Sequence, residues 1–230
     1  MNKRLEDWVN WILYDELKNG VINAPKHLLG NHDYGDGQVI TVYRPYAEKV
    51  SVVSPTGKNR EEMECLAEGF YGYYSAKKKY KGTKYRIETT YQDGSTVVTA
   101  DAYAFDSQIT EFDTYLFAEG KLYDIYEKFG AHPMTIDGVK GTYFAVWAPH
   151  ARRVSVVGDF NMWDGSLNPM QMMQTSGIYE LFIPDVAPGA VYKYQILTRE
   201  GEILYKADPY GNQCQVRPDN ANVVADLTGY

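Results

Sequence analysis

The sequence has few cysteines and no long apolar run. Cys65 and Cys214 are the only cysteines among 230 residues, too few for a disulfide framework or a cysteine-rich zinc site. We expect both to be buried, reduced thiols. Acidic residues interrupt the amino terminus before any long apolar stretch, and no run approaches the ~20 apolar residues of a membrane helix. These absences predict a cytoplasmic protein with no signal peptide and no contact with a membrane.

Positive charge is also scarce. The chain has 23 Lys plus Arg against 30 Asp plus Glu, for a net charge of -7, whereas nucleic-acid binding depends on cations that neutralise phosphates. The basic cluster Lys77-Lys78-Lys79-Tyr80-Lys81 is therefore interpreted as a solvated loop or a charged strand edge. We expect neutral ligands and no nucleic-acid partner.

Motifs of catalysis and of metal binding are missing. The sequence contains no His-Glu-x-x-His, no Cys-x-x-Cys, no Gly-x-Ser-x-Gly and no phosphate-binding glycine loop, and its 4 histidines lack the spacing of metal ligands. Glycosidic chemistry needs two carboxylates about 5 to 10 Å apart, and no pair stands out among the 30 acids. We therefore predict no catalytic residue, cofactor or metal.

Tyrosine is abundant, with 21 residues beside 4 Trp and 8 Phe, which suits both β structure and surfaces that stack on sugars or bases. Short β-rich runs separated by turn residues begin near Val39, with no helix-length segment between them. This spacing favours an antiparallel sandwich. The runs are Val39 to Tyr43, Val50 to Ser54, Tyr71 to Ser75, Tyr85 to Tyr91 and Thr96 to Thr99.

Two segments have helical spacing instead. Apolar residues from Leu5 to Leu17 predict one short amino-terminal helix whose apolar stripe packs against the next part of the chain. Residues 111–130 repeat the pattern around Gly120 and are predicted to form a helical connector between two domains.

The β pattern then restarts as a copy. Residues 39–53 and 143–157, offset by 104, share 7 identities in 15, and Lys84-Tyr85-Arg86-Ile87 is echoed by Lys193-Tyr194-Gln195-Ile196. A repeat of this length indicates duplicated domains. We predict an all-β chain with a helix and lead-in at 1–30, a first sandwich at 31–110, the connector at 111–130 and a second sandwich at 131–230.

A tryptophan in a polar turn is the first candidate for binding. Trp163 lies in Gly158-Asp159-Phe160-Asn161-Met162-Trp163-Asp164-Gly165, where a ring is poorly placed for the core and well placed to meet a ligand. Candidate polar partners are Asn161, Asp164 and Lys193. Alternatively, Trp163 folds back onto its own domain or seals a contact between domains. In the first copy Asn59 stands opposite Trp163, while Lys84 retains the lysine.

Residues 129–211 resemble the family 48 carbohydrate-binding module of bacterial glycogen (1,4-α-glucan) branching enzymes. The stretches that carry the resemblance include Gly141-Thr142-Tyr143-Phe144-Ala145-Val146-Trp147-Ala148-Pro149, Gly158-Asp159-Phe160-Asn161-Met162-Trp163, Gly177-Ile178-Tyr179-Glu180 and Ala207-Asp208-Pro209-Tyr210. The preceding repeat is similar to the extra amino-terminal module of the longer members. The resemblance implies two immunoglobulin-like sandwiches ahead of an α-amylase-type barrel that transfers an α-1,4 chain to a 6-hydroxyl. Because the barrel carries the catalytic carboxylates, this chain is expected to be inactive alone.

The resemblance also implies a binding site. Related glycogen-binding modules, including those of the β subunits of AMP-activated kinase, hold glucan with a Trp of the Gly-x-Phe-Asn-x-Trp turn, a strand Lys, a second Trp in the next hairpin and a downstream Asn. Trp163 and Lys193 match the first two. The hairpin reads Glu200-Gly201-Glu202-Ile203, with no aromatic residue until Tyr205. The downstream Asn is either Asn220 or Asn222.

The leading hypothesis is therefore binding of α-glucan, as glycogen or maltooligosaccharide, through Trp163, Lys193, Asn161 and Asn222, together with scaffolding of the parent enzyme's catalytic barrel. Modules that are purely structural and bind no appreciable glucan are the alternative, which the missing hairpin tryptophan favours. A third hypothesis is a self-sufficient enzyme.

Overall fold

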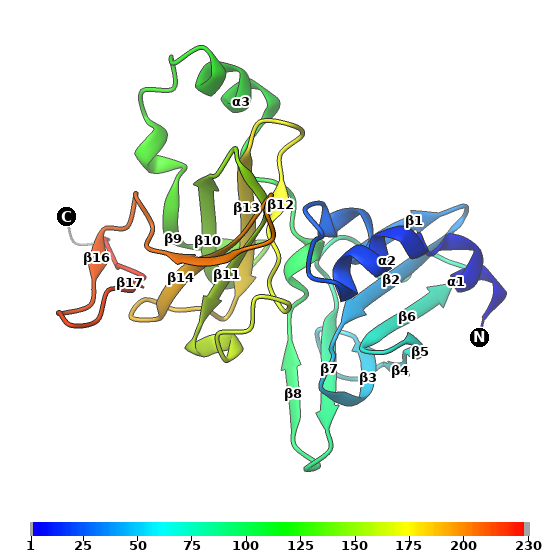
Figure 1. Ribbon diagram of the computed structural model, residues 1–230. Coiled ribbons are helices and arrows are strands. Elements are labelled where there is room, and N and C mark those ends of the chain that lie inside the picture. Colours follow the sequence, from blue (N-terminus) through cyan, green and yellow to red (C-terminus); the bar gives the residue numbers. More distant parts are fainter. Residues whose placement is uncertain (1, 228–230) are drawn as a thin grey trace. The chain divides into compact units, whose positions relative to one another are not determined.

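The computed structural model describes residues 2–227, which form two compact units (Figure 1). The first unit contains the described residues up to Tyr14 together with Lys26–Phe105, and the second contains Asp15–Pro25 together with the described residues from Asp106 onward. Strands paired in four antiparallel sheets dominate both units, which confirms the predicted all-β fold of two tandem immunoglobulin-like sandwiches.

The amino-terminal segment forms two short helices where the sequence predicted one. Helix α1 (Lys3–Trp8) ends at Val9, whose backbone is extended, and α2 (Trp11–Lys18) begins after Asn10. The Asn10 Oδ1 atom accepts a hydrogen bond from Ile12 N at 3.1 Å, as an N-capping side chain does. The helical spacing of the apolar residues is therefore interrupted, and Ile12 is 73% exposed.

The first sandwich consists of two four-stranded sheets with the orders β1-β2-β6-β5 and β4-β3-β7-β8. Two 3-10 turns, η1 (Pro25–His27) and η2 (Ala102–Ala104), flank the strands. The strands are β1 (Gly30–Tyr34), β2 (Gly37–Tyr43), β3 (Ala47–Val53), β4 (Arg60–Glu62), β5 (Glu64–Ala67), β6 (Phe70–Ser75), β7 (Arg86–Tyr91) and β8 (Thr96–Thr99).

The core of this unit lies between its two sheets. Alternate residues of β2 and β6 meet alternate residues of β3 and β7 in one buried cluster, as expected where two sheets pack face to face. The strand residues of this cluster are Ile40, Val42, Val50, Val52, Tyr71 and Ile87.

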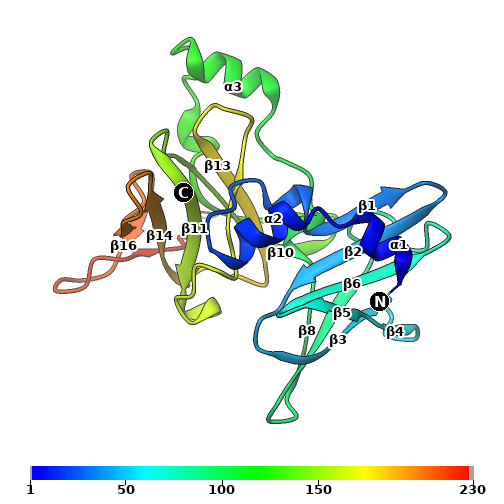
Figure 2. The same ribbon diagram turned by 45° about the vertical axis from the view of Figure 1, so that its right-hand side comes forward.

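The second sandwich has sheets with the orders β12-β13-β10-β9 and β11-β14-β17-β16, and β15 pairs with β14. The connector supplies α3 (Glu111–Ala118) and η3 (Ile125–Glu127), and α3 lies at one end of this unit in both Figure 1 and Figure 2. The other elements are β9 (Gly130–Ile136), β10 (Val139–Trp147), β11 (Ala151–Gly158), η4 (Asp159–Asn161), β12 (Gln171–Met172), β13 (Ile178–Pro184), β14 (Val191–Thr198), β15 (Ile203–Lys206), β16 (Gln213–Cys214) and β17 (Asn222–Val223).

A buried carboxylate attaches the start of the connector to this sandwich. Glu180 on β13 is 1% exposed, and its Oε2 atom accepts hydrogen bonds from the backbone N–H groups of Gln108 (3.1 Å) and Ile109 (3.2 Å). Tyr143 donates its hydroxyl proton to the same oxygen at 2.8 Å. Helix α3 then begins with a reciprocal capping box between Thr110 and Asp113.

The two units share a buried Tyr–Asp hydrogen bond and a strand order, as expected for duplicated domains. In each, a buried tyrosine hydroxyl donates to a buried aspartate: Tyr85 to Asp101 at 2.6 Å, and Tyr192 to Asp208 at 2.8 Å. Burial raises the pKa of both aspartates above the ordinary value. The strand order β1-β2-β6-β5 of the first unit recurs as β9-β10-β13-β12 in the second, so the duplication extends from sequence to fold.

Strand register corrects one correspondence between the copies. Val53 pairs with Arg86 in the first unit, and Val157 pairs with Lys193 in the second. Arg86, not Lys84, therefore occupies the place of Lys193. The sequence comparison was wrong by two residues because two closely spaced tyrosines, at 192 and 194, allow either alignment of the Lys-Tyr pair.

Two other expectations concern exposed residues. Both cysteines are free but exposed, so the prediction of buried thiols is wrong. In the basic cluster, Lys78 pairs with Asp33 at 2.6 Å and Lys79 pairs with Glu61, while Tyr80 is only 6% exposed. This segment is therefore a solvated basic loop anchored by one core aromatic residue. Within residues 2–227 no helix has the length and apolar character needed to cross a membrane.

Candidate functional site

The Trp163 side chain is held in place by its own turn. After β11 the chain forms η4, and then both Met162 (φ 55°) and Trp163 (φ 61°) adopt the left-handed conformation. This conformation costs a non-glycine residue about 1–2 kcal/mol, and such costs are concentrated at functional sites. The indole Nε1–H of Trp163 donates to Asp159 Oδ1 at 2.8 Å. The ring is partly exposed and has a defined orientation.

Asn161 belongs to the framework of this turn. Its side chain is 5% exposed, its Oδ1 atom accepts from Gly158 N at 2.9 Å, and its Nδ2 group donates to Val156 O at 2.9 Å. A third bond joins Nδ2 to Asn168 Oδ1 at 2.8 Å. With these partners Asn161 shapes the turn that presents Trp163, and it lies beneath the surface on which the sequence predicted it to meet a ligand.

Lys193 is paired with one of the two candidate asparagines. It lies on β14 opposite Val157 of β11, and its Nζ group donates to Oδ1 of the exposed Asn220. Asn222, in contrast, is 1% exposed and accepts a hydrogen bond from Asp208 N at 2.6 Å. The structure therefore brings Asn220 to Lys193 and places Asn222 in the core of the β14–β17 sheet.

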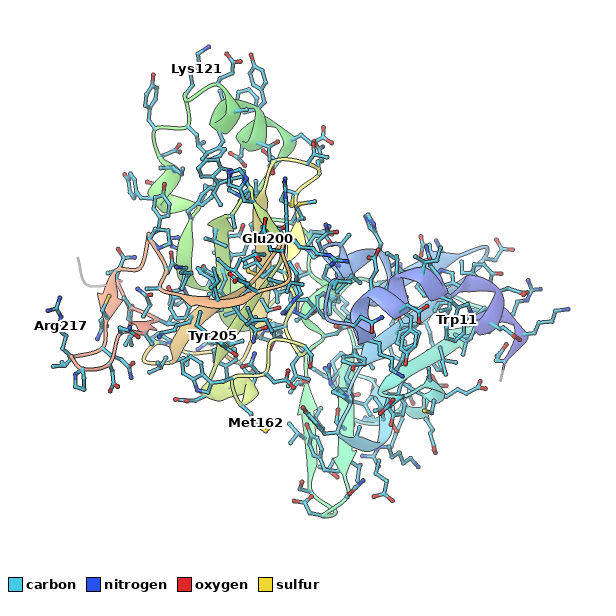
Figure 3. The ribbon with its side chains drawn as sticks, viewed as in Figure 1. Trp11, Lys121, Met162, Glu200, Tyr205 and Arg217 are labelled. Carbon is cyan, nitrogen blue, oxygen red and sulfur yellow. The ribbon has the colours of Figure 1, made fainter. Side chains whose placement is uncertain are left out.

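Tyr205 supplies a second exposed aromatic ring near this lysine. The register of the β14–β15 hairpin pairs Gln195 with Tyr205, so Tyr205 lies on the face of the sheet that carries Lys193 and Gln195. Tyr205 is 50% exposed, and its hydroxyl accepts a hydrogen bond from Gln195 Nε2 at 2.9 Å. Figure 3 labels Tyr205, and it labels Met162 in the turn that follows β11.

A buried arginine links the two aromatic elements. Arg153 is 4% exposed. Its Nη2 group donates to Gln195 Oε1 at 2.7 Å, and its Nη1 group donates to Gly165 O at 2.9 Å. The turn that carries Trp163 and the strand pair that carries Tyr205 are thus connected by charge-assisted hydrogen bonds.

Gly165 makes this connection possible. A Cβ atom at residue 165 would lie 2.0 Å from Gln195 Oε1 and 3.0 Å from Arg153 Nη1. Because glycine has no Cβ atom, the turn can lie directly against the Gln195 side chain. The turn that carries Trp163 is thereby fastened to the β11–β14–β15 strands, whose outer face carries Lys193 and Tyr205, with Asn220 bonded to Lys193.

The first unit has no aromatic residue at the corresponding positions. Its β3–β4 turn is closed by a hydrogen bond from Ser54 N to Asn59 O at 2.9 Å, in place of η4. Glu88 takes the position of Gln195, since each pairs with the equivalent serine, and Val98 opposite Glu88 takes the position of Tyr205. This face of the first unit therefore lacks both rings.

Tyr205 was not among the site residues assigned from the sequence, and Asn220 was the alternative to the assigned Asn222. Tyr205 could have been found by counting outward from the hairpin turn, because the pairing of Thr198 with Glu202 across the turn puts residue 205 opposite residue 195. The choice of Asn220 over Asn222 depends on the path of β17, and no local sequence pattern indicates that path.

Comparison with known proteins identifies two families. Residues 12–103 match the amino-terminal domain of the alpha-1,4-glucan branching enzyme GlgB, and residues 128–211 match carbohydrate-binding module 48, described as the isoamylase N-terminal domain. The two matches cover the two sandwiches separately.

Curated relatives agree with these matches. The chain is 45% identical over 206 residues to the 1,4-alpha-glucan branching enzyme GlgB of Synechocystis sp., covering 89% of this chain and 26% of the relative. It is 44% identical to the enzyme of the same name from Trichodesmium erythraeum, covering 90% and 27%. It thus spans about a quarter of the length of these relatives. The chain therefore corresponds to the amino-terminal region of the GlgB family of 1,4-alpha-glucan branching enzymes.

Proposed function

We propose that this chain is the α-glucan-binding and scaffolding region of a glycogen-branching enzyme, and that it is inactive without the catalytic part. The proposal is supported by the Arg153 link between the turn that carries Trp163 and the strand pair that carries Lys193 and Tyr205. Aromatic faces stack on the C–H groups of glucose, and polar groups at the rim bond to its hydroxyls. Lys193 Nζ and the Asn220 amide supply these polar groups.

The hydrogen bonds of the Trp163 and Tyr205 side chains support binding because they reduce the entropy that these side chains would lose when a ligand binds. The indole is oriented by Asp159 and the phenol by Gln195 before any ligand arrives. Side chains that are already ordered lose less entropy on association, which improves affinity. Asn161 and Asn222 take part in the proposal as supports of the turn and of the sheet.

Gel electrophoresis with dissolved glycogen tests the site. Glycogen in a native gel should retard the wild-type chain, and Trp163→Ala should abolish most of the retardation. Loss of a central aromatic anchor costs about 2 kcal/mol or more, which is roughly thirtyfold in affinity. Trp147→Ala is the matched control because Trp147 is 51% exposed and lies on β10, in the other sheet of the same unit. Equal retardation of wild type and Trp163→Ala would exclude Trp163 from the site.

A scaffolding role is supported by a second surface of the same unit. Aromatic side chains along α3 and the segment after it are largely exposed. They are Phe112 (66%), Tyr115 (57%), Tyr123 (85%) and Tyr126 (63%). Exposed apolar patches of this kind mark protein interfaces, and the relatives contain about three quarters of their length beyond the matched part. We propose that the catalytic barrel of the parent enzyme covers this surface.

Mixing the chain with the separately expressed barrel tests this role. Association detected by gel filtration, weakened by Phe112→Ala combined with Tyr115→Ala, is the expected result. The scaffolding proposal fails if the barrel does not associate with the chain and if adding the chain does not change the length of glucan that the barrel prefers to transfer. The parent activity proposed here is the transfer of α-1,4-linked chains to 6-hydroxyls in the cytoplasm. Because the catalytic carboxylates are proposed to lie in the barrel, the isolated chain should leave the iodine stain of amylose unchanged.

A further inference from the structure

An open pocket lies in the first unit, away from the position that corresponds to Trp163. It has a volume of about 380 Å³, within the range of small-ligand sites. The turn between β2 and β3 forms one side, and the end of β7 with the following turn forms the other. Its lining residues are Pro45, Tyr46, Ala47, Tyr91, Gln92 and Asp93.

The backbone around this pocket is firmly held. Ala47 pairs with Tyr91 next to an irregularity in the β3–β7 ladder, and Ala47 O accepts the Tyr71 hydroxyl at 2.9 Å. On the other side, Asp93 Oδ1 accepts hydrogen bonds from Ser95 N at 2.9 Å and from Ser95 Oγ at 2.6 Å. The two walls of the pocket are therefore preformed.

The duplicated unit shows that the aromatic lining is specific to the first copy. Ala151 pairs with Thr198 as Ala47 pairs with Tyr91. Thr198 thus replaces Tyr91, and His150, which precedes Ala151, replaces Tyr46.

The next residue of the second copy, Arg199, donates from Nη2 to Pro149 O at 3.3 Å, bridging the two turns that bound the pocket in the first copy. In the first copy Gln92 follows Tyr91 in the sequence. The first sandwich therefore has Tyr46 and Tyr91 at a place where the second has His150 and Thr198.

We propose that this pocket of the first unit is a second α-glucan subsite that holds one or two glucosyl units. Tyr46, which is 53% exposed, and Tyr91 offer ring surfaces to the sugar. The Gln92 amide donates hydrogen bonds, and the Asp93 carboxylate accepts them from hydroxyls. The lining contains a carboxylate and no cation, which disfavours phosphate or any other anion. The choice of glucan as the ligand rests on the proposed function.

The consequence for the whole chain is bivalency. When branches of one glycogen particle occupy both subsites, the second binding event occurs at a high effective concentration. Such an arrangement strengthens binding to glycogen beyond the affinity of either subsite for a short oligosaccharide.

Backbone amide NMR of the full 230-residue chain, titrated with maltoheptaose, tests the proposal. We expect two sets of shifting amides, one at residues 46–47 and 92–95 and one at residues 162–164. Tyr46→Ala and Gln92→Ala should each weaken binding at the first set about tenfold or more while the second set titrates as in the wild type. Trp163→Ala should have the opposite effect. His150→Ala, at the equivalent position of the second unit, should change neither titration.

The outcomes separate the two proposals. If maltoheptaose shifts only the amides near Trp163, the pocket is not a glucan subsite and the proposed function stands. If only the amides at 46–47 and 92–95 shift, the subsite stands and the Trp163 face fails. If neither set shifts, both proposals are overturned. The subsite would also be overturned if the amides at 46–47 and 92–95 no longer shifted in Trp163→Ala but still shifted as in the wild type in Tyr46→Ala. Their shifts would then be secondary to binding at Trp163.

Discussion

The indole nitrogen of Trp163 donates a hydrogen bond to Asp159 Oδ1 at 2.8 Å, across a turn whose residues 162 and 163 are both left-handed. Aspartate in such a position commonly serves only to form the turn. The bond gives Asp159 a second role, because it selects one orientation of a ring that is otherwise partly surrounded by solvent. The affinity of the face should therefore depend on a residue that does not itself stack on the ligand.

Asp159→Ala should weaken binding of maltoheptaose about fivefold, because one hydrogen bond contributes about 1 kcal/mol. Asp159→Asn keeps an acceptor oxygen in the same place and should bind nearly as well as the wild type. Quenching of tryptophan fluorescence during titration measures both affinities. Equal affinities of Asp159→Ala and the wild type would show that the bond does not orient the ring.

Tyr205 should act through its ring more than through its hydroxyl. Tyr205→Phe loses only the hydrogen bond from Gln195 and should bind glycogen within about threefold of the wild type, whereas Tyr205→Ala should bind about tenfold more weakly, in line with a loss of about 1–2 kcal/mol. Glycogen-affinity electrophoresis compares the two. A loss as large in Tyr205→Phe as in Tyr205→Ala would assign the contribution to the hydroxyl.

Gly165→Ala should destabilise the second unit by about 1–3 kcal/mol, since overpacking of a closely packed site has costs of this size. The cause would be the clash of the new Cβ atom with Gln195 Oε1. Thermal unfolding followed by circular dichroism measures the loss. In a Gln195→Ala background the same substitution should cost less, which a double-mutant cycle detects. An equal cost in both backgrounds would point to a different origin of the strain.

The Glu61–Tyr73 pair of the first unit should make the free energy of unfolding fall at high pH. Burial, followed by the hydrogen bond and the charge of Glu61, raises the pKa of Tyr73 from 10.0 to about 12. The pKa of Tyr73 is higher in the folded than in the unfolded chain, so the protonated hydroxyl contributes to the free energy of unfolding. This contribution is complete below about pH 10 and is lost as the pH rises toward about 12.

NMR of ring-labelled tyrosine titrates Tyr73 directly. Glu61→Gln should move its pKa part of the way back toward 10.0, since burial remains while the charge is gone. Tyr74, the adjacent residue in the same strand, provides an internal comparison in the same spectra. An unchanged pKa of Tyr73 in Glu61→Gln would leave burial as the sole cause.

The duplication could be detected from the sequence because both copies keep the residues on which the sandwich depends. Alternation of apolar and polar residues defines a strand locally, and residues 39–53 and 143–157 share 7 identities in 15. Trp163 and Lys193 were likewise recognisable because their turn and strand carry local motifs.

Other features depend on which residues the fold brings together. The break at Asn10 depends on competition between a side-chain cap and the helix backbone, a balance that apolar spacing does not report. The exposure of Cys65 and Cys214 depends on the position of edge strands in the finished sheets. The equivalence of Arg86 with Lys193 depends on strand register, which a one-dimensional alignment did not resolve.

The sequence by itself determined the all-β class, the two tandem copies and the tryptophan turn, because each is encoded in residues that lie close together along the chain. Only the tertiary structure placed Tyr205 and Asn220 on the face that carries Lys193. Lys193, Tyr205 and Asn220 reach that face from a central strand, a hairpin partner and a loop. The hydrogen-bond register between strands decides which of these side chains lie next to one another. Register depends on residues far apart in the sequence, so no local pattern specifies it.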